Sequence, residues 1–449
     1  MIKLFIIFQI SCFISSISLA GILNEKFILT IKPSDKIIPF TETNLENKFW
    51  FFHNDPQNLI NEKFKSPPEL FVHVNFWFNI YVLFNSDMIV IHDKEDLSLI
   101  YDIIDFSKLS QSELKQFTRL ALKNQFISDQ LKIYRDGLRR YNHKIRPRNL
   151  IESKIHSVLE KRFGKSSRKI RNKFLSQNIR AQTGQNDFIT IGLEKIGPFI
   201  PLIFKMSDQL GVPKDVVTLS LLESSFNHLA VSKVGATGPW QIMQETGAHF
   251  LKIDDMLDHR LNPILSTLGA FHILLDNFKV VKNWPLSILA YNIGTGHIVN
   301  ARRKLKKRTL TLQQFLSSYK HPNIGFASTN YISEFFALNY ALQYQKIIFN
   351  QDSLHIPDVN DQKDINVYLS LCKIIPRKLF SNLHKTHPNL SRFNPHFLKP
   401  GRTYPRGSII VSDAVLESKQ FLQLTVNDLA SLFPKNIHRL VGNHRCSIR

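Results

Sequence analysis

Apolar residues are spaced differently in successive parts of the chain, and each spacing predicts a different kind of secondary structure. Residues 71–84 (FVHVNFWFNIYVLF) are rich in aromatic and β-branched side chains, which favour strands. Two further apolar runs follow, at residues 88–92 and 97–106, with turn-forming residues between them. We therefore expect a small α+β unit over residues 24–106.

Helical spacing begins near Ser107. The sequence Ser110-Gln111-Ser112-Glu113 is typical of a capped helix start, and apolar side chains then recur every three or four residues. Lys and Arg are frequent between residues 135 and 173, where they more often form a solvated face than a binding surface. We expect a basic helical region over residues 107–186.

Between residues 187 and 350, helical segments alternate with Gly and Pro residues, a pattern typical of a compact all-α domain. The pattern changes after Ile356-Pro357, where short apolar pieces stand between Pro- and Gly-containing turns. Residues 408–411 are predicted to form a strand. A third region therefore covers residues 357–449.

The first 20 residues have the pattern of a secretory signal peptide, because one Lys precedes an apolar run that ends in small residues before Gly21. The run is shorter than the roughly 20 residues that span a membrane. An uncleaved anchor and a buried strand are the alternatives, and the residues before Cys12 match a lipidation signal poorly. We expect export to the periplasm or cell envelope. The mature protein should be soluble or peripheral to a membrane or the cell wall, because no other window offers about 18 consecutive apolar residues.

Composition adds a strong positive charge. The 449 residues carry 58 Lys and Arg against 36 Asp and Glu, a formal net charge of +22, which favours polyanionic partners such as nucleic acid, acidic lipid or an anionic cell-wall polymer. Compositional drift explains the same charge equally well. Three Cys residues do not support a disulfide framework, although Cys372 and Cys446 remain to pair after export.

One carboxyl group stands out by its position. Residues 215–222 (DVVTLSLL) are apolar nearly all round, which predicts a buried helix, and Glu223 comes at its carboxyl end. Apolar surroundings and the negative end of the helix dipole both disfavour the carboxylate, so we expect a raised pKa, as a general acid requires. The alternative is a structural Glu that is paired with an Arg or with backbone donors.

The residues after Glu223 suit a sugar-binding groove. Gly235 and Gly238 allow a tight loop, and Ser232 is near enough in sequence to present its hydroxyl to the same site. Trp240-Gln241 offers an aromatic face for stacking beside an amide. This mixture of aromatic, amide and hydroxyl groups is what sugars bind.

Ordered motifs carry a family resemblance. The segment ESSFNHLAVSKVGATGPWQIM (223–243) resembles the catalytic signature of the soluble-type lytic transglycosylases. The segments DHRLNPILST (258–267), LAYNIGTG (289–296) and TNYI (329–332) resemble the later motifs of that family, in the same order. The flanking segments are similar to those of membrane-bound lytic transglycosylase D-like enzymes, and residues 374–411 resemble their degenerate LysM-like tail.

The resemblance implies a mainly α protein. A lysozyme-like, all-α catalytic domain over residues 187–350 would be flanked by the small α+β N-terminal unit and by a degenerate LysM-like, cell-wall-associating region over residues 357–449. The implied reaction is cleavage of the β-1,4 bond between N-acetylmuramic acid (MurNAc) and N-acetylglucosamine (GlcNAc) in peptidoglycan strands, with formation of 1,6-anhydro-MurNAc ends. Glu223 would act as general acid and then as general base, without a metal or a cofactor.

The resemblance also assigns substrate-binding residues. Ser232 would hold the 2-acetamido group of the sugar, while Gln241, Tyr291 and Asn292 would line the acid's side of the cleft and Tyr331 would close it. Taken alone, a Tyr at such positions is often a core residue with its hydroxyl satisfied. Four residues depart from the family pattern without removing the acid: Gln244 for Pro, Gly247 for Ala, Asn262 for Asp and Ile293 for Ala.

Three other functions are alternatives to lytic transglycosylation. A hydrolytic muramidase on the same fold differs only in whether water reaches the intermediate, and the sequence does not separate the two. A non-catalytic peptidoglycan-binding scaffold is disfavoured by the presence of Glu223, Ser232 and Tyr291. Nucleic-acid binding is disfavoured by the export signal and by the lack of a recognition-helix motif. The sequence predicts no oligomeric state.

Overall fold

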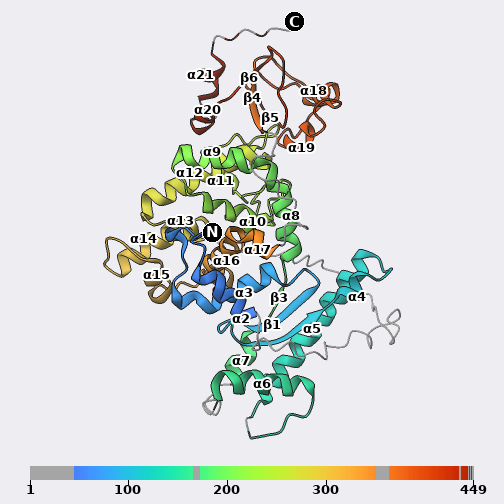
Figure 1. Ribbon diagram of the computed structural model, residues 1–449, viewed down its shortest axis with the longest axis vertical. Helices are drawn as coiled ribbons and strands as arrows, with labels where there is room; N and C mark the ends of the chain where they lie inside the picture. The colour runs from blue at the N-terminus through green and yellow to red at the C-terminus, as the bar shows by residue number, and fades with distance from the viewer. Residues whose placement is uncertain are drawn as a thin grey trace.

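The structure is a computed structural model that describes residues 45–142, 144–164, 172–349, 364–433, 436–442, 444 and 446. The predicted signal peptide over residues 1–20 lies outside the described residues. Helices make up most of the described chain, and two small sheets lie at opposite ends of the molecule (Figure 1). The prediction of a mainly α protein is confirmed.

The N-terminal unit begins with two helices, α2 (Leu45–Asn54) and α3 (Phe71–Val82), with single-turn helices at Glu62–Phe64 and Pro68–Leu70 between them. The strand character expected for residues 71–84 is therefore wrong. Every residue of α3 from Val74 to Tyr81 is buried, and α3 packs along α16 (Phe326–Gln343). Burial on all sides outweighs the strand preference of its side chains.

A three-stranded antiparallel sheet follows α3, in the order β2-β1-β3. Its strands are β1 (Met88–Asp93), β2 (Ile100–Asp105) and β3 (Ile179–Thr183). His92 of β1 pairs with Arg180 of β3. Because β3 comes from the stretch that was expected to be purely helical, described residues from both sides of position 106 share this sheet, and we refer to them together as the N-terminal unit.

Four helices accompany this sheet: α4 (Ser107–Ser110), α5 (Gln116–Arg140), α6 (Leu150–Phe163) and α7 (Asn172–Asn178). Apolar side chains of β1 and β2 share a core with those of α5 and α6. The capped start expected at Ser110–Glu113 is wrong, since the Ser112 hydroxyl donates to the carbonyl of Leu109 (2.7 Å) and α5 begins only at Gln116.

The catalytic region is a compact group of helices whose apolar faces form the largest core of the molecule. Its longer helices are α8 (Asn186–Ile196), α9 (Ile200–Leu210), α12 (Pro263–Val281), α13 (Trp284–Ile293), α14 (Thr295–Lys304) and α16 (Phe326–Gln343). Its shorter ones are η5 (Gly197–Phe199), η6 (Lys214–Val217), α10 (Thr218–Ser224), α11 (Gln244–Gly247), η7 (His259–Leu261), α15 (Leu312–Ser318) and α17 (Gln345–Ile348).

Helix α12 is long and apolar enough to cross a membrane, and no other helix in the described part of the chain is. However, 61% of its most apolar window is buried inside the protein. It packs against α13 and α9, as a central core helix does.

The C-terminal unit packs onto the catalytic helices (Figure 1). Its sheet has the order β5-β4-β6, and its elements are β4 (Asn366–Ser370), α18 (Pro376–Leu383), α19 (Leu390–Phe393), β5 (Ile409–Ser412), β6 (Phe421–Gln423), α20 (Val426–Ala430) and α21 (Ile437–Val441). The strand expected at residues 408–411 is confirmed within one residue. Phe393 packs edge-on against Phe199 at a ring distance of 5.0 Å, so the two regions share one core.

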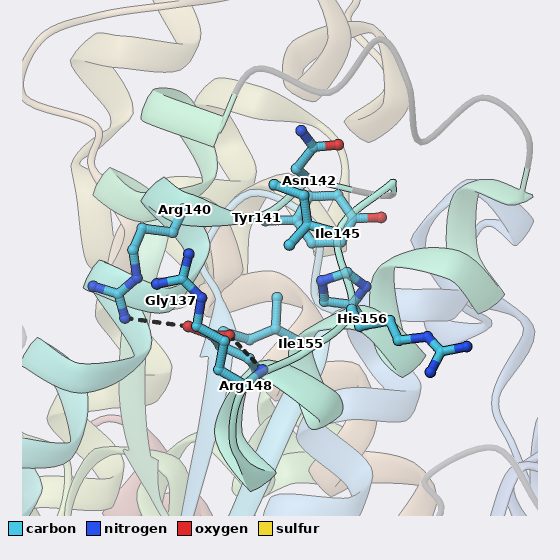
Figure 2. Close-up of a pocket in the computed structure, with 10 residues that line it drawn as sticks. Gly137, Arg140, Tyr141, Asn142, Ile145, Arg148, Ile155 and His156 are labelled. Atoms are coloured by element: carbon cyan, nitrogen blue, oxygen red, sulfur yellow. Dashed lines mark hydrogen bonds and ion pairs between the residues drawn. The ribbon is translucent and has the colours of Figure 1, made fainter.

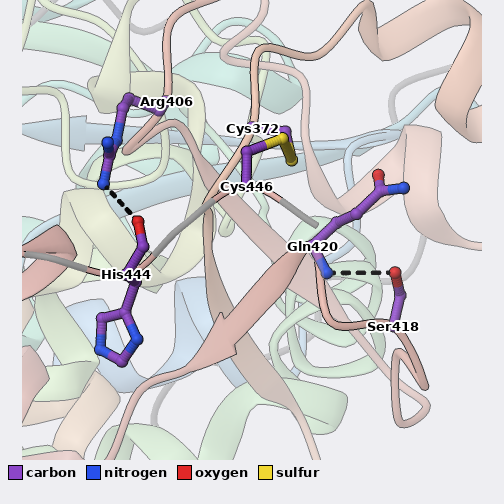
Figure 3. The surroundings of a disulfide bond; sticks show 6 residues. All are labelled: Cys372, Arg406, Ser418, Gln420, His444 and Cys446. Atoms are coloured by element: carbon purple, nitrogen blue, oxygen red, sulfur yellow. Dashed lines mark hydrogen bonds between the residues drawn. A yellow bond between two sulfur atoms is a disulfide. The ribbon is translucent and has the colours of Figure 1, made fainter. Parts of the chain in front are cut away.

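Cys372 and Cys446 form a disulfide, which was left open by the sequence (Figure 3). Cys372 follows β4, and Cys446 lies beyond the last helix. Beside this link, the Arg406 side chain donates to the carbonyl of His444 (3.0 Å). The disulfide therefore ties the end of the chain to the C-terminal sheet.

Candidate active site

Glu223 lies in the last turn of α10, where the sequence predicted the end of a buried helix. The first four residues of α10, from Thr218 to Leu221, are buried, whereas Leu222 and Glu223 are partly exposed. The helix ends because Ser225 and Phe226 both adopt left-handed backbone conformations, with φ of 51° each. This conformation costs non-glycine residues roughly 1–2 kcal/mol each, and such strain is concentrated at functional sites.

Two tyrosines from other helices meet Glu223. The Tyr331 hydroxyl of α16 donates to Glu223 Oε1 at 2.8 Å, and Tyr331 itself is fully buried. The Tyr291 hydroxyl of α13 donates to the carbonyl of Trp240 (2.8 Å). Burial, reinforced by the nearby charge of Glu223, raises the pKa of both tyrosines well above the usual value, so both hydroxyls remain protonated donors. Tyr331 thus supports the carboxyl from inside the fold, which differs from the expected closing of a cleft.

The loop from residue 227 to residue 243 lies against the end of α10, because the Ser224 hydroxyl donates to the carbonyl of Pro239 (2.9 Å). The Ser232 hydroxyl accepts the backbone N–H of Ala236 (2.9 Å), and the Gln241 amide donates to the carbonyls of Ala230 and Gly238. Both side chains are partly exposed. Gln241 also has a positive φ of 46°. These contacts give the loop a fixed shape beside the end of α10.

A buried ion pair holds this loop from behind. Arg260 donates to both carboxylate oxygens of Asp258, and its other nitrogen donates to the carbonyls of Gly235 and Ile242 (3.1 Å each). The D-x-R motif was matched in the sequence without a role for either residue. Its role here is to hold the loop in place, because the Arg260 guanidinium binds the loop at two separate carbonyls, those of Gly235 and Ile242.

Trp240 is a core residue, and the sugar-stacking surface expected from it is wrong. Its side chain is fully buried, its indole N–H donates to the hydroxyl of Thr267 (2.9 Å), and its ring packs against Phe271. The sequence could not show which way this side chain points. Thr267 is the last residue of the motif 258–267, which also contains Asp258 and Arg260. Both ends of this motif therefore contact the loop.

Asn292 is 4% exposed, and neither polar atom of its amide has a hydrogen-bond partner among the described residues. It follows Tyr291 on α13. A buried amide without protein partners is costly, so this one stands out among the polar groups near the site.

Two departures from the family pattern have local reasons. The Asn262 side chain caps α12 by accepting the N–H groups of Ile264 and Leu265, and its amide nitrogen donates to Phe393 and His396 of the C-terminal unit. An Asp could cap the helix but has no hydrogen for those two contacts. At Gly247, an added methyl group would lie 3.0 Å from two isoleucine side chains, which is tighter than ordinary packing.

One further acid near Glu223 was not found from the sequence. The acids that follow Glu223 along the chain, Glu245, Asp254 and Asp255, are all exposed. Glu334 of α16 is instead 7% exposed, and its pKa is shifted partly by the charge of Glu223. The signal that could have found it is the one that found Glu223, a lone acid in an apolar helix.

The pocket in Figure 2 is separate from this site. It lies between the end of α5 and α6 and is lined by Arg140, Arg146, Arg148 and His156. Glu152 accepts the backbone N–H of Arg148 (2.8 Å) and lies 3.4 Å from a guanidinium nitrogen of Arg140, so part of the positive charge is already neutralised. None of the predicted site residues lines this pocket.

A comparison with known protein families identifies the domain that contains Glu223. Residues 201–313 match the family described as Transglycosylase SLT domain. The chain contains an SLT domain. Glu223, Ser232, Gln241, Tyr291 and Asn292 lie inside it, and Tyr331 follows it. The resemblance seen in the motifs is thereby confirmed.

Three similar proteins each align with this chain over 113 residues, which is also the length of the family match. The membrane-bound lytic murein transglycosylase D of Escherichia coli strain K12 is 31% identical over 113 residues, and that of E. coli O6:H1 gives the same value. A protein of Alteromonas sp. strain M-1 that is named for tributyltin chloride resistance is 27% identical over 113 residues. The match covers 25% of this chain and 25% of each E. coli protein, but 55% of the Alteromonas protein. Each of these matches thus covers a quarter of this chain, and a quarter of each E. coli protein.

Proposed function

We propose that this protein is a peptidoglycan lytic transglycosylase that cleaves the MurNAc–GlcNAc bond and leaves 1,6-anhydro-MurNAc ends. The observation that carries the proposal is the contact of Glu223, at the strained end of α10 in the SLT domain, with Tyr331 of the helix that follows this domain. The E. coli proteins that share this domain are named as lytic murein transglycosylases.

In this reaction one carboxyl group acts twice. Glu223 gives its proton to the glycosidic oxygen as the bond to C1 of MurNAc breaks, and the substrate's own 2-acetamido oxygen stabilises the cationic carbon. The Glu223 carboxylate then takes the proton of the 6-hydroxyl, whose oxygen bonds to C1. Glu223 ends the cycle protonated. An intramolecular nucleophile has a large effective concentration, so the water and the second carboxylate of ordinary glycosidases are not required.

The surrounding residues support this proposal by their chemistry. Tyr331 fixes the orientation of the Glu223 carboxyl. The Ser232 hydroxyl accepts a backbone N–H, and a hydroxyl that accepts one bond still has its own hydrogen to give to an acetamido oxygen. By the resemblance, Gln241 and Asn292 would line the acid's side of the sugar.

We place the protein in the cell envelope. The pattern of residues 1–20 and the membrane-bound naming of the E. coli relatives both favour this location. The Cys372–Cys446 disulfide also favours it, because structural disulfides persist in oxidising compartments. The C-terminal unit, by its resemblance to a LysM-like tail, would add contacts to the wall, although it shares the core of the SLT domain.

Mass analysis of the products from purified cell wall tests the proposal. Anhydro ends are expected, and these are lighter by one water than the hydrated reducing ends that a muramidase would leave. Glu223→Gln should lower the rate by about 10²–10⁴ or more at unchanged thermal stability, because it removes the acid and base. The matched control is Glu245→Gln, an exposed acid of the same motif region. Near-normal turnover by the Glu223 variant would disprove the assignment.

A further inference from the structure

A second carboxyl group lies behind the candidate active site, on the same helix as Tyr331. Glu334 follows Tyr331 by one helical turn on α16 and is 7% exposed. Residues one turn apart on a helix are neighbours on its surface, about 5–6 Å between Cβ atoms. The Tyr331 hydroxyl touches Glu223 Oε1, and the charge of Glu223 acts on Glu334, so the two carboxyl groups lie near one another.

The contacts of α16 show which way Glu334 faces. Asn330 faces α3, because its side chain accepts the indole N–H of Trp77 (3.1 Å), and Tyr331 faces α10. With 3.6 residues per turn, Glu334 falls between these two directions. A further contact, from Thr218 to Asn339 (3.2 Å), holds α10 along the same helix. Glu334 therefore points into the junction of α3, α10 and α16, and its low exposure keeps it away from substrate.

The partners of Glu334 come from the N-terminal unit. The Tyr81 hydroxyl of α3 is hydrogen-bonded to it, and Arg180 of β3 supplies the nearby positive charge. Arg180 lies over the ring of Phe326 (4.3 Å), the first residue of α16, and pairs in the sheet with His92. The titratable groups at this junction are Tyr81, His92, Arg180, Glu223, Tyr291, Tyr331 and Glu334.

Burial raises the pKa of Glu334 to about 8. The Arg180 charge opposes this shift, the charge of Glu223 adds to it, and the Tyr81 hydrogen bond opposes it. Burial lowers the pKa of His92 to about 3, so His92 is neutral and adds no charge. Glu334 therefore changes its charge within the pH range in which enzymes are assayed.

We propose that Glu334 is a positioning residue of the site: Arg180 and Tyr81 hold it behind Glu223, where its charge controls how firmly the Glu223 carboxyl keeps its proton. This inference rests on the proposed function. It makes the N-terminal unit part of the active-site machinery, because α3 and β3 supply both partners of Glu334.

The sign of the effect follows from like charges. Below about pH 8, Glu334 is neutral and leaves Glu223 undisturbed. Above that pH, ionised Glu334 disfavours a second negative charge on Glu223, so more of the acid form of Glu223 persists than without it. Glu334→Gln keeps the shape of the neutral side chain but cannot ionise. Its kcat/KM should match the wild type from about pH 5 to pH 7 and fall about 3–10-fold below it at about pH 9, the effect of half to one pKa unit.

Asp215→Asn is the matched control for this pH profile. Asp215 is also a buried carboxyl that links α16 to the N-terminal unit, through Asn339 and Asn61, but it lies at the opposite end of α10 from Glu223. The kcat/KM of Asp215→Asn, divided by that of the wild type, should not vary with pH. If Glu334→Gln likewise shows a ratio to wild type that is constant from about pH 5 to pH 9, the role of Glu334 is only structural and the inference is wrong.

A titration without turnover gives an independent test. With 13C-labelled glutamate, the Glu334 carboxyl signal should titrate near pH 8 in the wild type, and lower by about 0.5–1 pH unit in Glu223→Gln, because coupling is reciprocal. An unmoved titration in that variant would overturn the inference even if Glu334→Gln failed to fold. If the Glu334 titration shifts in Glu223→Gln but the wild type makes no anhydro products, only the proposed function is refuted. If the wild type makes anhydro products but the titration does not shift, only this inference is refuted.

Discussion

At the scale of single residues, Glu223 shows how a chemical role depends on a distant contact. The sequence located the acid at a helix end, but the group that holds its carboxyl, the Tyr331 hydroxyl, lies 108 residues away and on another helix. Because Tyr331 has no exposed surface, it cannot be a substrate contact in the described conformation. Its contribution must come through Glu223.

Tyr331→Phe isolates that contribution. The variant keeps the ring and removes one hydrogen bond to a carboxyl group, worth about 1.5–3 kcal/mol when the acceptor is charged. We expect kcat/KM to fall about 10–100-fold, measured well below the melting temperature of the variant, when anhydro product release is followed from soluble glycan fragments.

Tyr340→Phe serves as the control for this prediction. Tyr340 is buried on the same helix, but its hydroxyl accepts the backbone N–H of Ser66 (3.2 Å), away from Glu223. Its loss should affect stability and leave the rate nearly unchanged. Equal rates for Tyr331→Phe and the wild type would contradict the supporting role of the hydroxyl.

At the scale of elements, the loop from residue 227 to residue 243 depends on two glycines for different reasons. Both have left-handed backbones, with φ of 84° at Gly235 and 78° at Gly238. A methyl group at Gly235 would meet nothing within 4 Å, whereas one at Gly238 would lie 1.8 Å from the carbonyl oxygen of Arg260. Only Gly238 is therefore required for the close approach of the loop to its supporting motif.

Substituting alanine at each of the two glycines separates the cost of a left-handed backbone from the cost of a steric clash. Gly235→Ala should cost about 1–2 kcal/mol, the usual penalty of a left-handed residue. Gly238→Ala carries the same penalty and a collision with backbone, so its loss of stability should exceed that of Gly235→Ala by several kcal/mol or prevent folding. Urea unfolding of the two variants makes the comparison, and equal stabilities would show that the loop can shift away from Arg260.

The elements also show where sequence patterns succeed and fail. The short strands at residues 88–92 and 408–411 were recognisable because strand formers alternate with clear turns there. Residues 71–84 have the same composition but form α3, since burial on all sides allows a helix of aromatic residues. Glu334 and its partners Arg180 and Tyr81 could not be grouped from sequence, because only packing brings these three segments together. The raised pKa expected for Glu223 and the roles of its sugar-binding neighbours remain predictions.

At the scale of the whole molecule, the flanking units are not separable attachments. Helix α3 packs on α16, and the C-terminal unit enters the main core through residues such as Phe393 and Val367. A hydrogen bond between Asn262 and His396 also links the SLT domain to the C-terminal unit. Deleting residues 364–449 would expose this shared core, so a deletion cannot distinguish lost wall binding from lost folding. Surface substitutions are the better test of how the molecule reaches the wall.

A clearly basic surface of the SLT domain is the end of α14 and the turn after it, which we call the basic tip. It consists of five exposed side chains: Arg303, Lys304, Lys306, Lys307 and Arg308. Helix α14 begins just after Tyr291 and Asn292, so the basic tip and the candidate site belong to the same stretch of the SLT domain. Peptidoglycan stems carry carboxylates, and attraction between exposed charges extends over only about 8 Å at physiological salt.

Neutralising the basic tip to Gln should therefore weaken sedimentation with insoluble sacculi at low salt and flatten its dependence on salt up to about 0.5 M, while the bond that is cleaved stays the same. The control removes five exposed charges from the C-terminal unit: Arg377, Lys378, Lys385, Lys399 and Lys419. A larger effect at the tip would localise the attraction to the SLT domain, and equal effects would assign it to the net charge of +22. Unchanged binding and an unchanged salt dependence in the tip variant would mean that these residues only solvate the surface, and that the basicity of the chain reflects its composition.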